Sequence, residues 1–404
     1  ARSMSCAPSF LFPLLHDIKS SQDLDSFLRQ AISLSYRYSR MKSEEGQDSI
    51  VNTSMVLHGW EAIYHHLLIN LSFVLLQQKR DLNIYFTLDL FLAFIRTSPM
   101  PRLAQGGHSI TVHVLFNPNV PESHLTLRNL ESFLSHLRDA GSLVQFEAWV
   151  ADEEAAPQSF CFVEGAFALL LNGLLQGSPL GTHIEEPKYM MEMGWLMRRL
   201  FSHLATYPHQ EALDEVRADR KNLLKTLKTC QVIYAFGNFG FLVERSHLEG
   251  MEGETQIKDF MAEAMCTLMR LPIPMLINAS AVEHFTQTHA TRMPLMGDLR
   301  FDIQDQVAYL ASYQQIAQEG KSVSIFLTKS EFPSCAILDL KDTLLIYVPG
   351  QDLEQEQFIT LPKRLCGRLI PGLEVFLRKE SIPLDKGLLE NYLSNLADSG
   401  MTES

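Results

Sequence analysis

Apolar residues recur along the chain with helical spacing in some segments and with strand-like alternation in others. Spacing of three to four residues indicates the buried face of a helix, and alternation indicates a strand with one buried face. In the first half, the pattern predicts the order helix, strand, helix, strand, helix and three strands, at residues 60–78, 83–87, 90–96, 108–116, 130–140, 143–149, 160–163 and 166–171.

The second half of the chain repeats this order of elements. The corresponding predictions are a helix, a strand, a helix, a strand, a helix and three strands, at residues 213–227, 231–236, 257–271, 275–278, 305–319, 323–328, 335–338 and 343–348. Strands alternating with helices are typical of α/β domains, and repetition of the whole series indicates an internal duplication.

Individual residues also match between the two halves. Gly141 and Gly320 each follow a predicted helix, where glycine is favoured, and they are 179 positions apart. At the same offset, Leu134, Leu137, Val144 and Phe146 coincide with Tyr313, Ile316, Val323 and Ile325. Two short stretches also correspond: Ile84-Tyr85 with Ile233-Tyr234, and Leu115-Phe116-Asn117 with Leu276-Ile277-Asn278. The alternative is that any two α/β segments share similarities of this kind, and we prefer duplication.

The length of 404 residues exceeds what a single core usually holds. We therefore expect an α/β fold with two similar lobes, at residues 56–180 and 181–354. Helical extensions are expected at residues 4–55 and 355–404.

The order of elements resembles one half of a phospholipase D superfamily enzyme, over roughly residues 55–350. Such enzymes have two similar halves that meet at a shared active site. Each half carries the motif His-x-Lys-x4-Asp, usually followed by glycine, at the start of a strand pair. The resemblance implies two half-repeats whose motif positions can be compared residue by residue.

The catalytic motif is degenerate in both halves. A residue that cannot transfer a proton replaces the histidine, a serine replaces the lysine and a carboxylate remains: Pro157, Ser159 and Glu164 in the first half, and Phe332, Ser334 and Asp339 in the second. The whole chain contains no His-x-Lys pair. Serine without an adjacent base is a weak nucleophile, and loss of both lysines removes the stabilisation of a charged transition state. The resemblance thus implies a catalytically inactive member. Alternatively, Glu164 and Asp339 are ordinary turn residues.

Other candidate chemistry is sparse. Glu283, His284 and His289 place a carboxylate and two imidazoles within seven residues, which is either a partial metal site or a solvated loop. The turn at 237–240 lacks the third glycine of a dinucleotide fingerprint and the Gly-Lys-Ser/Thr of a phosphate loop. We therefore predict no catalytic residues, no metal and no cofactor.

Composition narrows the classes of partner and the compartment. A net charge of −13 opposes binding to phosphate backbones, so no nucleic-acid partner is expected. No uncharged apolar run reaches the ~18 residues of a membrane span. Six scattered cysteines without metal-like spacing favour a reducing, cytoplasmic location.

These observations predict a protein-interaction or regulatory module with a protein partner, a second copy of the chain being one candidate. The aromatic and methionine-rich segments 189–195 and 236–241 are either an interaction surface or part of the core. One alternative is an active hydrolase that uses residues outside the motif, such as His284 or His289. Another is the small-ligand sensor domain of a regulator, which would need an output module that the sequence does not show.

Overall fold

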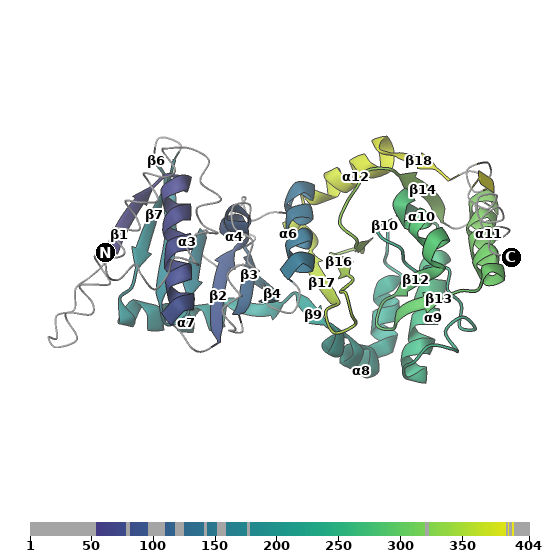
Figure 1. The fold of residues 1–404 in the computed structure, drawn as a ribbon, viewed down its shortest axis with the longest axis horizontal. Helices are drawn as coiled ribbons and strands as arrows, with labels where there is room; N and C mark the ends of the chain where they lie inside the picture. Colours follow the sequence, from purple (N-terminus) through teal and green to yellow (C-terminus); the bar gives the residue numbers. More distant parts are fainter. Residues whose placement is uncertain are drawn as a thin grey trace. The chain divides into compact units, whose positions relative to one another are not determined.

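The computed structural model describes residues 54–77, 81–95, 110–117, 125–140, 144–151, 159–175, 178–319 and 323–384, with positions 387, 390 and 391. The chain divides into two compact units, Ala1–His124 with Ser135–Leu204, and Leu125–Leu134 with Ala205–Ser404. Each unit contains an eight-stranded sheet (Figure 1). The predicted N-terminal extension lies outside the described residues, apart from its last two positions.

The sheet of the first unit has the strand order β1-β7-β6-β5-β2-β3-β4-β8. Three neighbouring strands are parallel: β2 (Leu82–Thr87), β3 (Ile110–Phe116) and β4 (Val144–Ala151). The other strands are antiparallel to their neighbours: β5 (Ser159–Val163), β6 (Phe167–Leu175), β7 (Ser178–Ile184), β1 (Ser54–His58) and β8 (Phe201–Leu204). The helices are α3 (Trp60–Gln77), α4 (Leu88–Ile95) and α7 (Pro187–Leu200), and α6 (Leu127–Ala140) is divided, with its residues up to Leu134 assigned to the second unit.

The sheet of the second unit has the order β18-β14-β11-β10-β15-β16-β17-β9. Its parallel strands are β10 (Val232–Ala235), β11 (Pro274–Asn278) and β14 (Ser324–Thr328). The antiparallel strands are β15 (Ala336–Asp339), β16 (Thr343–Val348), β17 (Gln357–Pro362), β9 (Thr206–Pro208) and β18 (Ser381–Pro383). The main helices are α8 (His209–Leu227), α9 (Thr255–Met269), α11 (Ile303–Glu319) and α12 (Leu369–Lys379).

The two sheets have the same strand order. Read from the opposite edge, the second sheet runs β9-β17-β16-β15-β10-β11-β14-β18, which reproduces the first strand for strand, with the same parallel and antiparallel pairs. The second unit adds helix α10 (Ala279–Thr288) and the hairpin β12 (Ala290–Met293) to β13 (Gly297–Arg300) after β11. The prediction of two similar α/β lobes is confirmed.

Strand register places equivalent residues opposite equivalent partners. In the first unit Ile84 lies opposite Val112 on one side and Val163 on the other, and in the second unit Ile233 lies opposite Met275 and Leu338. These pairings are compatible with the predicted match of Ile84 with Ile233, which we use as the reference for the two sheets.

The register also tests the offset of 179. Val112 pairs with Phe146, and its equivalent Met275 pairs with Ile325, so Phe146 and Ile325 occupy the same position 179 residues apart. The predicted match of Leu115 with Leu276 is not compatible with this reference, because in the same register Leu276 corresponds to His113, two residues away.

The unit boundaries differ from the predicted ones. Strand β7, helix α7 and strand β8 complete the first unit, so its boundary lies after Leu204 and not at position 180. Likewise, β17 and β18 are strands of the second sheet and α12 packs against it, so residues 357–383 are not a separate extension. Both β7 and β17 supply the backbone partners that the preceding strand needs.

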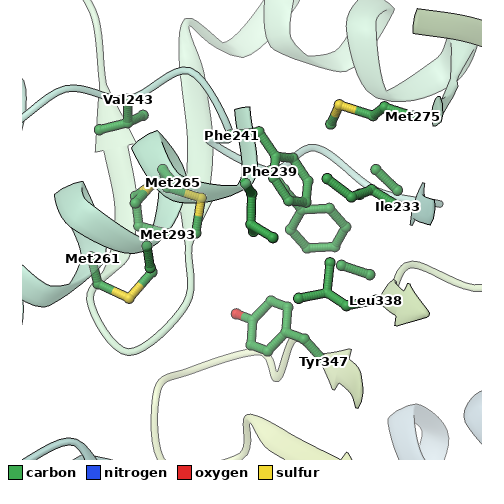
Figure 2. Packing of buried hydrophobic residues seen from close by; sticks show 14 of the residues in the cluster. Ile233, Phe239, Phe241, Val243, Met261, Met265, Met275, Met293, Leu338 and Tyr347 are labelled. Carbon is green, nitrogen blue, oxygen red and sulfur yellow. The ribbon is translucent and has the colours of Figure 1, made fainter. Parts of the chain in front are cut away.

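The core of the second unit lies between its sheet and helices α8, α9 and α11. In Figure 2, Phe239 and Phe241 lie between Met261 and Met265 of α9 and the sheet residues Ile233 and Leu338. The other face of the sheet is covered by α12, whose Phe376 ring lies 5.6 Å from that of Phe236. Helices thus cover both faces of this sheet.

In the first unit, helix α3 approaches the sheet closely. A Cβ atom at Gly181 of β7 would lie 2.9 Å from Cγ1 of Ile63, a fully buried α3 residue. The absence of a side chain at Gly181 is what lets α3 approach β7 at this point. On the opposite face, Met190, Met193 and Met197 of α7 pack against the strands.

Candidate ligand-binding site

The second unit contains an apolar cavity of about 350 Å³ under helices α8 and α9. One wall is the sheet, from which alternate residues of β15, β16 and β17 face inward, because side chains on one face of a strand recur every second residue. The opposite wall is formed by the two helices. The main apolar lining residues are Val216, Leu223, Leu227, Phe241, Phe260, Met261, Ala264, Met265, Leu268, Leu338, Leu345 and Phe358.

Helix α9 supplies one wall because its apolar residues share a face. Phe260, Met261, Ala264, Met265 and Leu268 recur at intervals of one, three and four residues, all are buried, and all line the cavity. A small alanine between two methionines leaves room that a larger side chain would fill. Methionine adapts its shape readily, so this wall can conform to different apolar ligands.

Helix α8 completes the helical wall and is interrupted at Asp219, whose backbone is not helical (φ −142°, ψ 48°). Asp219 Oδ1 accepts a hydrogen bond from the backbone N–H of Asn222, at 3.3 Å, and so caps the second part of the helix. Two ion pairs connect α8 to the segment of α9, Arg217 with Glu254 and Arg220 with Glu263, each at 2.6 Å. The helix is therefore joined to α9 on both sides of the interruption.

The start of α8 is attached to the sheet by a buried carboxylate. Glu356 is fully buried, and its oxygens lie 2.6 Å from Nδ1 of His209, 3.0 Å from the backbone N–H of Leu295 and 2.9 Å from the hydroxyl of Tyr347. Three polar partners satisfy this carboxylate, as a buried charge requires. Burial, and then the Glu356 charge, raise the pKa of Tyr347, so this hydroxyl stays protonated and donates to Glu356.

Polar groups at the cavity are few and carry little charge. The lining includes the hydroxyl residues Tyr207, Thr226, Thr343 and Thr360, and the carboxylate of Glu215. Thr226 and Glu215 are exposed, while Thr343 and Thr360 are half-buried, so these groups mark the mouth of the cavity. A mostly apolar pocket with a few polar groups at one side is the usual form of a small-molecule site.

The motif positions of the second unit do not come together. Ser334 is exposed just before β15, and Asp339 is the last residue of that strand, so the two lie about 17 Å apart along an extended chain. Ser334 lies against Gly237, where a Cβ atom would meet its hydroxyl oxygen at 2.3 Å. Phe332 is half-buried and packs on Phe236, at 4.5 Å between rings.

Asp339 is a buried structural acid. Its carboxylate lies 2.8 Å from Nζ of Lys363, and its backbone C=O accepts from Gln231 at 2.8 Å. With Ile84 matched to Ile233, Glu164 of the first unit corresponds to Asp339, because the two acids directly follow Val163 and Leu338.

In the first unit, Glu164 belongs to a polar chain across the sheet. Its Oε2 accepts from Nδ2 of Asn83 at 3.0 Å, and Oδ1 of Asn83 lies 3.3 Å from Nε2 of His113. Ser159, at the other end of β5, is not joined to this chain by any bond among the described residues, and Pro157 lies outside them.

The chain continues from His113 to Glu147 and Trp149 of β4. Nδ1 of His113 lies 3.0 Å from Oε2 of Glu147, and the Trp149 indole N–H is 3.2 Å from the same oxygen. The hydrogen bond with His113 lowers the pKa of Glu147 although burial opposes it. Tyr85 stacks on the imidazole, at 4.2 Å between rings. This arrangement was not predictable from the sequence, because its members come from four separate strand regions.

The other sequence candidates do not form a metal site. Glu283 and His284 are exposed on α10, whereas His289 ends that helix in a left-handed conformation, with Nδ1 2.7 Å from Oε1 of Gln306. The segment predicted as a loop is thus mostly a helix. Within the described ranges, no group of three or more His, Cys, Asp or Glu side chains could hold a metal ion.

The two segments considered as surface or core behave differently. Phe236, Phe239 and Phe241 are buried, so 236–241 belongs to the core. Helix α7 is divided, since Met190 and Met193 are buried whereas Met191 and Trp195 are 71% and 63% exposed. Within the described part of the chain, no helix is both long and apolar enough to cross a bilayer.

Comparison with known proteins gives distant structural matches. No protein-family model matches the chain, and no curated protein sequence is similar to it at a significant level. Solved structures that resemble it include a polyphosphate kinase from Porphyromonas gingivalis, with 11% identity, a TM-score of 0.28 and 88% of this chain covered. This chain spans 58% of the length of that kinase.

Two further matches carry phospholipid-related names. The phospholipase D family member Nuc from Salmonella typhimurium has 9% identity and a TM-score of 0.25, covering 39% of this chain and 99% of Nuc. Phosphatidylserine synthase from Haemophilus influenzae has 8% identity and a TM-score of 0.26, covering 87% of this chain and 95% of the synthase. At these scores the fold assignment rests on the strand order of the two sheets.

Proposed function

We propose that the chain is a non-catalytic regulatory module whose second unit binds a small, mostly apolar molecule between α8, α9 and the sheet. The observation that carries the proposal is the cavity of about 350 Å³, because its size and apolar lining match those of small-molecule sites. Binding there would be driven by removal of apolar ligand surface from water. This role corresponds to the small-ligand sensor considered from the sequence.

The motif positions support a role without phosphodiester chemistry. The chain has no His-x-Lys pair, and Phe332 packs on Phe236 at the position where the resembled family has its histidine. Ser334 has no base bonded to it among the described residues, and an unactivated hydroxyl is a weak nucleophile. A protein partner remains a prediction, as does a second copy of the chain.

Decan-1-ol is a suitable first probe, titrated into the full chain by isothermal calorimetry. We expect saturable binding to the wild type and loss of binding in Ala264→Phe, because Ala264 is buried in the cavity wall and the ring would fill the space. Ala308→Phe is the matched control, since Ala308 is exposed on α11.

A second variant tests the same cavity in case Ala264→Phe does not fold. Thr343→Phe adds the same ring at the half-buried mouth of the cavity and should also weaken binding. Folding of each variant is checked by circular dichroism. Absence of binding to the wild type, or equal loss in the Ala308→Phe control, would contradict the proposal.

The absence of catalysis has its own test, which is hydrolysis of bis(p-nitrophenyl) phosphate. We expect no turnover above buffer. Turnover that disappears in His289→Ala would overturn the non-catalytic proposal and favour the hydrolase alternative.

A further inference from the structure

The charged groups around the cavity are distributed unequally. Among the described residues that line it there is no lysine, arginine or histidine, and Glu215 is the one ionised group. An anionic ligand head would therefore meet a carboxylate and find no cation in the lining. The lining therefore favours some classes of ligand head group over others. The inference that follows rests on the proposed binding function.

Nearby arginines do not neutralise Glu215. Arg217 is paired with Asp214 at 2.5 Å and with Glu254 at 2.6 Å, and Arg220 is paired with Glu263 at 2.6 Å. Within the described chain, Glu215 itself has neither an ion pair nor a side-chain hydrogen bond. The lysines of α8 at positions 221 and 225, and Lys228 directly after it, are exposed and do not line the cavity. Glu215 is therefore an unpaired negative charge at the mouth.

Aromatic rings lie in the same lining. Tyr207 of β9 and Phe358 of β17 are half-buried and both face the cavity. The face of an aromatic ring attracts a cation through its quadrupole, and quaternary ammonium groups are bound in this way. A carboxylate together with aromatic rings in one lining favours a positively charged head.

The cavity volume limits the size of the apolar part. A cavity of about 150 Å³ holds benzene, so at roughly 25 Å³ per non-hydrogen atom the space of about 350 Å³ corresponds to about 14 such atoms. An alkyl chain of about ten carbons with a small head group matches this size.

We propose that the natural ligand is a cationic amphiphile whose alkyl or similarly apolar body occupies the cavity while its ammonium group lies at the mouth beside Glu215. Glu215 is then a specificity-determining residue, and the apolar walls supply most of the affinity. Ligands of the same body with a carboxylate head are bound less tightly.

Three probes with the same chain length test the ligand class: decan-1-ol, decyltrimethylammonium and decanoate, titrated by calorimetry below their micelle concentrations. The expected order of affinity is cation above alcohol above carboxylate, with about tenfold between the two charged probes, since an attractive and a repulsive contact each change affinity a few-fold. Raising the salt concentration to 1 M should reduce this ratio.

Glu215→Gln is the critical variant. It should weaken the binding of decyltrimethylammonium by about two- to fivefold, the range of an exposed ion pair, and leave the affinity for decan-1-ol unchanged. Glu211→Gln removes the same charge from an exposed position of α8 outside the lining. It should alter the affinity for each charged probe only through the small change in the net charge of the protein. A shift in Glu215→Gln that equals the shift in Glu211→Gln would contradict the assignment of Glu215.

The outcomes separate the two proposals. If none of the three probes binds, the proposed binding function fails. If decan-1-ol binds but the two charged probes bind equally, or the carboxylate binds better, the cavity is a binding site and the inference about its ligand class is wrong.

Discussion

The two units share a strand order but differ in how the first helix meets the sheet. In the first unit α3 packs closely on β7, where Gly181 admits the buried side chain of Ile63. Extending the strand registers makes Glu356 the residue equivalent to Gly181. There the equivalent helix α8 is attached through His209 to a buried carboxylate. One position thus holds the smallest residue in one copy and a hydrogen-bonded acid in the other.

On the opposite face of the sheet, the first unit is polar and the second unit is largely apolar. Asn83, His113, Glu147 and Trp149 form a polar chain in the first unit, whereas their equivalents by register are Val232, Leu276, Phe326 and Thr328. The second unit is therefore largely apolar where the first is polar, and its cavity lies on the face where the first unit is tightly packed. The two units thus share their strand order. The first unit has a polar chain on one face of its sheet, and the second unit has an apolar cavity on the opposite face.

The largest change in stability is expected from a substitution that removes the close packing of α3 on the sheet. Ile63→Ala should lower the free energy of unfolding of the first unit by about 2–5 kcal/mol, because it leaves a void under a fully buried side chain. All three tryptophans, at positions 60, 149 and 195, belong to this unit, so tryptophan fluorescence during urea unfolding measures it selectively.

Ile303→Ala is the matched control, since Ile303 is 51% exposed in the second unit. It should leave the tryptophan-detected transition within about 0.5 kcal/mol of the wild type. A small effect of Ile63→Ala would mean that the contact with β7 is not tightly packed.

A smaller effect is expected from the acid that replaces the glycine. Glu356→Gln should destabilise the second unit by about 1–3 kcal/mol, because the amide cannot accept from His209, Tyr347 and the Leu295 N–H as the carboxylate does. Thermal unfolding followed by circular dichroism measures the loss. Glu354→Gln, at an exposed neighbouring position, is the control and should change little. Equal stability of the two variants would refute a structural role for Glu356.

The smallest effect concerns the polar chain of the first unit and depends on pH. Because the folded-state pKa of Glu147 lies below its ordinary value of 4.5, the stabilisation it provides is present above pH 4.5 and is lost as the pH falls through the folded pKa. The difference between wild type and Glu147→Gln, measured by urea unfolding with tryptophan fluorescence, should therefore shrink below that pH. Glu192→Gln on the exposed surface of α7, in the same unit, is the control. A difference that grows as the pH falls would reverse the sign and exclude this role.

Much of the fold was predictable because the parallel strands and their helices are strongly patterned. The predicted matches of Ile84 with Ile233 and of Phe146 with Ile325 agree with each other through the strand registers. The ends of the units were missed. Strand β7 contains Pro179 and Gly181, residue types that are unfavourable within strands, and α12 contains Pro371 and Gly372 in its first residues. Proline is tolerated in the first turn of a helix, and a local pattern does not distinguish that case from a loop.

The candidate site was less predictable than the fold. The cavity depends on how far α8 and α9 stand from β15–β17, and these distances follow from contacts between residues far apart in the chain. Glu356 and His209, for example, are separated by 147 positions. The sequence match of Glu164 with Asp339 is compatible with the registers of the two sheets, and each acid is separated by the length of β5 or β15 from Ser159 or Ser334.

The interruption of α8 at Asp219 has a consequence for its dynamics. It divides the helix into residues 209–218 and 220–227, and both parts are shorter than the ~12–15 residues that an isolated helix needs to persist in water. Each part therefore depends on its own contacts, the first on Glu356 and Glu254 and the second on Glu263. The two parts can unfold locally at different rates, so amide hydrogen exchange over α8 should show two protection levels with a step at Asp219, where a continuous helix would show one.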